Sequence, residues 1–255
     1  MLFVLFFDRL KSMVNADAKI EEMFKAGIHF GYSRSSRHPK MKDFLFGLKN
    51  NVEIFDLEKT DKKLNEAAEF LKNLGKEGKK ILLVGTKTEA KDLIKKFAED
   101  LNMPYVNERW LGGILTNFKG IRDRINHLND LEKKKQTGEL GKYTKKEQLQ
   151  IEREIIRLKT YLEGLVNLES LPAALIVVDS KKETNAVKET NNIPIPTVAI
   201  MNTDCNPNEV KYFIPANDNS RSSIEFILNE LAKAYKEGKN EKENEKENEN
   251  NSGQN

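Results

Sequence analysis

Apolar positions along the chain follow two patterns, short continuous runs and longer stretches at helical spacing. Continuous runs begin at Ile81, Ala174 and Ile195, and each is typical of a strand buried on both faces. Helical spacing recurs in residues 20–26, 60–74, 88–101, 182–191 and 220–235. Because strands and helices alternate along most of the chain, the pattern predicts a parallel sheet with helices on both faces.

Two short extended segments are expected before the first of these buried strands. Residues 44–48 and 52–57 are mainly apolar, and Asn50 and Asn51 lie in the connection between them. Asn readily takes the positive φ angle of a tight turn, so we expect the two segments to form a hairpin. Thr60 is then expected to cap the helix that follows.

One long stretch interrupts the alternation. Residues 118–131 and 149–165 each carry apolar side chains at helical spacing among many charged ones, and Gly138 and Gly141 lie between the two stretches. No buried-strand pattern occurs there. We therefore expect an antiparallel helical hairpin inserted between two strands, with the spacing of a short coiled coil.

The two ends of the chain differ from the rest. An apolar run of about six residues near the start is far shorter than the ~20 residues that span a bilayer, and it lacks the features of a signal peptide. Because Met13 follows them, we interpret residues 1–12 as a mis-assigned upstream start or as a frayed extension. The tail has no apolar residue to anchor it and is expected to be disordered. The predicted parts are an extension (1–18), a sheet domain (19–115 and 170–236), a hairpin insertion (116–169) and a tail (237–255).

Charge and cysteine content narrow the class of protein. The net charge is +3, but residues 236–255 hold four Lys and six Glu, which leaves +5 on the rest of the chain. Cys205 is the single cysteine, so no disulfide can form within the chain and a reducing compartment fits best. Neither Cys205 nor the three histidines have the spacing of a metal site.

Enzymatic chemistry has little support in the sequence. Neither a dinucleotide-binding GxGxxG motif nor a P-loop is present, and no pattern resembles a nucleophile elbow. Lys87 follows the strand that begins at Ile81, where it could meet a phosphate or simply form part of a turn. We expect a protein that is not an enzyme. The alternative is a nucleotide- or phosphosugar-binding α/β enzyme with its site at the strand carboxyl ends.

Two basic segments are the candidates for binding nucleic acid. Arginine pairs with two phosphate oxygens at once, and neighbouring polar side chains can donate to phosphate or ribose. In the segment around Arg109, Trp110 offers a face on which a base could stack, although we expect Trp110 to pack in the core. The candidate RNA-binding residues are Arg34, Arg37, His38, Lys40 and Lys42 in the first segment, Lys87, and Arg109, Asn117, Lys119, Arg122 and Arg124 in the second.

Four stretches of the chain together resemble one protein family. They are AGIHFGYSRSSRHPKMKDFLFGLKNNVEIFDLEKT from Ala26, ILLVGTK from Ile81, NERWLGGILTNF from Asn107, and PTVAIMNTDCNPNEVKYFIPANDNSRSSI from Pro196. In this order and spacing, across residues 20–234, they are similar to the S-two family of small-subunit ribosomal proteins, of the bacterial and organellar type.

The resemblance implies a fold, a role and partners. It implies a Rossmann-like or flavodoxin-like three-layer α/β/α domain with an inserted helical hairpin. The implied role is structural: binding small-subunit ribosomal RNA near the junction of head and body, late in assembly, with no catalytic residue and no cofactor. Implied partners are neighbouring small-subunit proteins and the large mRNA-capturing protein built of repeated OB domains. We expect the protein in ribosomes of the cytoplasm, and an organellar ribosome also fits.

The chain departs from the family pattern at several polar positions. Tyr32 stands where the family often has His, Asn202 and Asn219 stand where it often has Asp, and only Asp218 of the carboxylates remains. Because most of the ligand charge is gone, we expect no metal there. The same changes put coupling to the OB-repeat protein through this surface in doubt. Arg37 and His38 replace a frequent Trp-Asn pair and add positive charge to the first basic segment.

Overall fold

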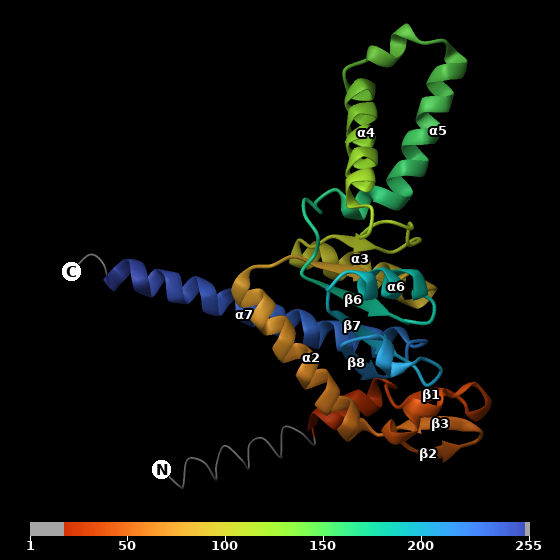
Figure 1. Ribbon diagram of the computed structural model, residues 1–255, viewed down its shortest axis with the longest axis vertical. Helices are drawn as coiled ribbons and strands as arrows, with labels where there is room; N and C mark the ends of the chain where they lie inside the picture. The colour runs from red at the N-terminus through yellow and green to blue at the C-terminus, as the bar shows by residue number, and fades with distance from the viewer. Residues whose placement is uncertain (1–17, 253–255) are drawn as a thin grey trace. The chain divides into compact units, whose positions relative to one another are not determined.

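The fold is built on a parallel sheet of five strands. The computed structural model describes the backbone of residues 18–252 and the side chains of residues 18–242 (Figure 1). The predicted upstream start at residues 1–12 lies outside this range. The sheet has the order β5-β4-β6-β7-β8, the strand order of flavodoxin-like folds. Its strands are β4 (Ile81–Val84), β5 (Tyr105–Val106), β6 (Ala174–Val178), β7 (Thr197–Met201) and β8 (Tyr212–Pro215). With its flanking helices, this sheet confirms the predicted α/β fold class.

Contacts within the chain group its residues into two compact units. The terminal unit comprises residues up to 78, 179–181 and those from 198 onward, and the hairpin unit comprises residues 79–178 and 182–197. The bounds of the two units differ from those predicted for the sheet domain and the hairpin insertion, and the predicted division into domains remains a prediction. Each unit is described by itself below.

A small antiparallel sheet forms part of the terminal unit. Its order is β1-β3-β2, from β1 (Phe30–Ser33), β2 (Leu45–Lys49) and β3 (Val52–Phe55). The predicted turn between β2 and β3 has φ angles of 50° at Asn50 and 64° at Asn51, as the asparagines indicated. Strand β1 was not predicted. The polar segment after it forms two short 3-10 turns, η1 (Arg34–Ser36) and η2 (Pro39–Phe44).

Helix α2 (Leu57–Glu77) begins earlier than predicted. Asp56, not Thr60, is its N-cap, and its side chain accepts hydrogen bonds from the backbone N–H groups of Glu58 and Lys59. Thr60 is fully buried, and its hydroxyl lies 2.8 Å from the carbonyl oxygen of Pro215, to which it donates. The buried threonine therefore ties α2 to β8 and does not start the helix.

Helix α7 (Arg221–Ser252) packs against α2 and continues into the tail that was expected to be disordered. At the crossing, a Cβ on Gly75 would overlap the carbonyl oxygen of Tyr235, and one on Gly238 would overlap that of Lys72. Beyond it, Glu241 pairs with Lys72 and Lys76. Close backbone contact and ion pairs with α2 hold the start of the tail in a helix. The lack of apolar residues there therefore did not indicate disorder.

The hairpin unit contains α3 (Thr88–Leu101), α6 (Thr184–Asn192) and the predicted helical hairpin. The hairpin helices are α4 (Phe118–Gln136) and α5 (Lys145–Leu162), which run side by side in Figure 1. Two 3-10 turns flank α5, η3 (Glu139–Lys142) and η4 (Glu163–Leu165). A capping box of Thr144 and Glu147 starts α5. Among the described residues, no helix is long and apolar enough to cross a bilayer.

The hairpin is held together by an apolar seam. The inner face of α4 buries four apolar residues three or four positions apart, and α5 contributes two that are buried. These side chains are Ile121, Ile125, Leu128 and Leu131 on α4, and Ile155 and Leu162 on α5. The spacing matches the helical pattern of the sequence.

Candidate nucleic-acid interface

A buried carboxylate organises the loop between β5 and α4. Glu189 on α6 accepts hydrogen bonds from Trp110 Nε1 at 2.9 Å, from the Gly113 N–H at 2.7 Å and from the Leu115 N–H at 3.0 Å. The backbone N–H and the hydroxyl of Thr116 both donate to it at 3.2 Å. Glu189 is only 9% exposed, so its charge is balanced almost entirely by these donors.

The environment keeps Glu189 ionised. Burial raises the pKa of this carboxyl, but the bonds from Trp110 and from the backbone of the loop outweigh burial and lower the pKa below its ordinary value. Gly113 has a φ of +93°, which favours glycine. The loop is therefore fixed from inside by one negative charge, and Trp110 is buried as expected.

Glu189 was not identified from the sequence as part of this site. In the sequence Glu189 does not stand out, because the chain has many Glu residues and most are expected on solvated helix faces. A signal was available, because Glu189 lies three positions after Ala186, on the helix face that also buries Val187 and Thr190. A glutamate on a buried helix face needs hydrogen-bond donors from another part of the chain. The glycine-containing loop between β5 and α4 can supply them through its backbone N–H groups.

Positive side chains extend from this fixed loop into solvent. Arg109 on the loop and Lys119 and Arg124 on α4 are exposed, and none of them forms an ion pair with the residues that the structure describes. Asn117 is exposed at the N-cap of α4, without a side-chain capping bond. Arg122 differs, because it donates to the carbonyl oxygens of Leu168 at 3.0 Å and Val166 at 3.4 Å. Its guanidinium therefore closes the base of the hairpin.

The first basic segment lies in the terminal unit and is also partly occupied by internal bonds. Arg37 pairs with the buried carboxylate of Glu53 at 3.0 Å. His38 holds its backbone through an N–H donated to the Thr203 carbonyl at 2.8 Å, and its Nδ1 accepts from the Lys40 N–H at 3.3 Å. The cations that face solvent without an ion pair to a described residue are Arg34, Lys40 and Lys42.

The polar positions that depart from the family pattern contact one another within the terminal unit. Asn202 donates to Asp218 at 2.7 Å and accepts from the Thr203 N–H at 2.8 Å, and the Tyr32 hydroxyl donates to Asn219 at 3.0 Å. Across the described residues, no three His, Cys, Asp or Glu side chains form a group that could hold a metal ion. The prediction that no metal binds rests on this donor set, which carries a single carboxylate.

The point where a doubly wound sheet usually binds phosphate is filled by a side chain. After β4, the N–H and the hydroxyl of Thr86 donate to Glu183, which is only 3% exposed, at 2.9 and 2.5 Å. A nucleotide phosphate would need the same donors. Lys87 follows at the N-cap of α3, half-buried and making no side-chain capping bond. This arrangement counts against the alternative of a nucleotide-binding enzyme.

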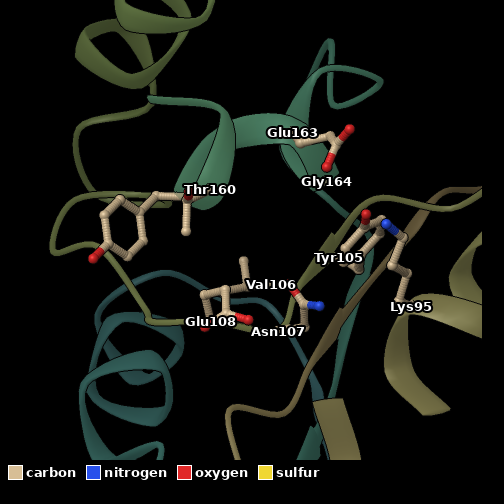
Figure 2. Close-up of a pocket in the computed structure, with 9 residues that line it drawn as sticks. Lys95, Tyr105, Val106, Asn107, Glu108, Thr160, Glu163 and Gly164 are labelled. Atoms are coloured by element: carbon tan, nitrogen blue, oxygen red, sulfur yellow. The ribbon is translucent and has the colours of Figure 1, made fainter. Parts of the chain in front are cut away.

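A polar crevice beside β5 is too small to change this view. Its volume is about 180 Å³, whereas sites for small ligands usually have 300–1,000 Å³. In Figure 2, Glu163 reaches toward the crevice from above and Glu108 from below. Glu108 pairs with Lys91 at 2.6 Å, and burial raises the pKa of Tyr105. Because Lys95 also lines the crevice, its charges are of both signs, and its small size is what counts against a bound ligand.

Comparison with known proteins places these features in a family. The family described as "Ribosomal protein S2" matches residues 23–238. The chain is 44% identical over 215 residues to "Small ribosomal subunit protein uS2" of Karelsulcia muelleri (strain GWSS), covering 84% of this chain and 97% of that protein. It is 43% identical over 219 residues to "Small ribosomal subunit protein uS2c" of Mesostigma viride, covering 86% of this chain and 96% of that protein.

Proposed function

Because the chain belongs to the ribosomal protein S2 family, we propose that it is a structural constituent of the small ribosomal subunit and binds ribosomal RNA there. It works in assembly and translation without catalysis, in ribosomes of the cytoplasm or of an organelle. Neighbouring small-subunit proteins complete its surroundings.

The observation that carries the RNA-binding part is the loop around Glu189. It presents Arg109, and the helix after it presents Lys119 and Arg124, on a backbone that is already fixed before any partner binds. A fixed loop loses little conformational entropy on binding. The three cations neutralise phosphates and release counterions, and recognition follows the shape of the RNA.

The first basic segment forms a second contact surface in this proposal. Arg34, Lys40 and Lys42 reach the phosphates, while Arg37 and His38 hold the segment in place through Glu53 and Thr203. In the hairpin unit, Arg122 has the corresponding supporting role. Asn117 and Lys87 remain candidate contacts to RNA.

An exposed aromatic patch supports a protein partner as well. Phe46 on β2 is 82% exposed and Phe24 is 59% exposed, and they line a cavity of about 470 Å³ in the terminal unit. Phe24 stacks on His29 with ring centroids 4.3 Å apart, so the patch is preformed. Open aromatic groups of this kind mark protein interaction sites. We propose that the patch contacts a neighbouring small-subunit protein, with the OB-repeat ribosomal protein as one candidate, and Phe46→Ser should reduce retention of that partner on purified subunits.

Sedimentation of native lysate through a sucrose gradient tests the central proposal. The protein should migrate with small subunits, resist moderate salt, and move to the top of the gradient after ribonuclease treatment. A position at the top of the gradient in every condition would show that this family member acts elsewhere.

A further inference from the structure

The base of the helical hairpin has a cavity of about 440 Å³, and of its lining residues only Arg124 belongs to the interface proposed above. We propose that it receives one unstacked nucleotide of ribosomal RNA, with its base against Tyr161 and its phosphate on Arg124 and Arg157. This inference rests on the proposed binding of ribosomal RNA and adds the form of RNA that is recognised. All the residues concerned lie in the hairpin unit.

The cavity has an apolar floor that exists before binding. Leu158 and Leu162 of α5 line it, together with Leu111 from the loop that Glu189 fixes through Trp110. The volume falls within the range of sites that hold small ligands. A base inserted here would bury its faces against carbon atoms, which a double helix, with its bases already stacked, cannot offer.

The rim of the cavity carries the positive charges of Arg124 and Arg157 and the negative charge of Glu154. Arg124 and Arg157 are exposed, and neither forms an ion pair with a described residue. Glu154, the acidic residue of the lining, has its carboxylate 3.4 Å from the ring of His127. Two free guanidinium groups above an apolar floor suit a phosphate joined to a base, because arginine binds phosphate oxygens bidentately.

Tyr161 supplies the aromatic surface. Tyr161 is 37% exposed and lines both this cavity and the polar crevice beside β5. Aromatic side chains and arginine planes are the surfaces on which unpaired RNA bases stack. An apolar side chain of a neighbouring protein could occupy the floor, but it would leave both guanidinium groups without a counter-charge. The nucleotide satisfies floor and rim together.

Ultraviolet cross-linking of the full chain to small-subunit ribosomal RNA tests the proposal, with the modified peptide identified by mass spectrometry. We expect a nucleotide adduct on Tyr161 in the wild type. Tyr161→Leu should lose the adduct and bind the RNA roughly fivefold or more weakly, because one stacked base is lost. Arg157→Ala leaves the three cations of the proposed interface in place and should lower the slope of log affinity against log salt by about one.

Arg153→Ala is the matched control, since Arg153 is an exposed arginine of α5 outside the cavity. It should keep the Tyr161 adduct and the wild-type salt slope. If the wild type binds RNA but the adduct lies elsewhere, and the Tyr161 and Arg157 variants bind normally, the cavity proposal is overturned while RNA binding stands. If the wild type does not bind the RNA, the proposed function itself is overturned. A cross-link from Tyr161 to another protein in intact subunits would also overturn the proposal, because the cavity would then hold a protein side chain and not a nucleotide.

Discussion

At the scale of single residues, buried charges fix the backbone and the supporting side chains of the candidate interface, whereas exposed charges are its candidate contacts with RNA. Glu189 and Glu53 are buried carboxylates that hold, respectively, the loop after β5 and Arg37 of the first basic segment. The sequence identified the exposed cations, because clusters of Lys and Arg are visible as composition. It did not identify the two carboxylates, because their partners are distant in sequence and only the fold brings them together.

Replacing Glu189 tests this arrangement. In the wild type, the second carboxylate oxygen of Glu189 accepts hydrogen bonds from N–H donors of the loop. In Glu189→Gln, one oxygen remains as an acceptor, but the NH₂ group faces those N–H donors and cannot accept from them. We expect a loss of about 1–3 kcal/mol in the free energy of unfolding, measured by urea denaturation. Glu169→Gln, at an exposed position, is the control and should change it by less than about 0.5 kcal/mol. Equal stability of the two variants would contradict the role given to Glu189.

The pH dependence of stability follows from the lowered pKa of Glu189. Where the pH lies between the folded pKa and the ordinary glutamate value of about 4.3, the unfolded chain binds a proton that the folded protein excludes. The stabilisation from Glu189 is therefore present above that ordinary value and is lost as the pH falls through the folded pKa. Denaturation curves of wild type and Glu189→Gln should converge on acidification. A constant difference down to the acid limit would contradict this.

At the scale of elements, the sequence predicts best where burial is complete and continuous. Strands β4 and β6 lie where their apolar runs are, and the hairpin helices follow their apolar spacing. It predicts less well where an element depends on a distant neighbour. Strand β1 has few apolar residues and exists because β3 pairs with it. The extension of α7 past Lys236 depends on the backbone of α2.

The crossing of α2 and α7 provides a test at this scale. In an isolated helix, Gly238→Ala would stabilise by about 1 kcal/mol. Here the new methyl group overlaps the carbonyl oxygen of Lys72, so we expect destabilisation by about 1–3 kcal/mol in thermal or urea unfolding. Gly141→Ala is the control, because a Cβ at Gly141 has no neighbour within 4 Å. If Gly238→Ala is the more stable variant, the helices do not cross at this point.

At the scale of the whole molecule, candidate contacts with RNA occur in both compact units. The sequence predicts two basic segments and gives all their cations the same role. The structure separates those with internal partners, Arg37 and Arg122, from those without an ion pair to a described residue, such as Arg34 and Arg109. A protein that uses several exposed cations of this kind should bind RNA with a strong dependence on salt.

Charge reversal at Arg34 tests the contribution of the terminal unit. Arg34→Glu should weaken binding to small-subunit ribosomal RNA, reduce the salt slope by about one, and lower incorporation into subunits in competition with wild type. Lys62→Glu introduces the same charge change at an exposed position of α2, outside the basic segment, and should incorporate normally. Equal incorporation of both variants would remove the first basic segment from the interface.

The carboxylate of Glu183 on the Thr86 donors has a consequence for how the protein behaves in the cell. A group tethered on the same chain competes with any diffusing anion at an effective concentration of roughly millimolar or more. The position that makes related folds responsive to nucleotides is thus permanently occupied by the protein itself. Changes in the concentration of free nucleotides in the cell should therefore leave the conformation of this loop unchanged.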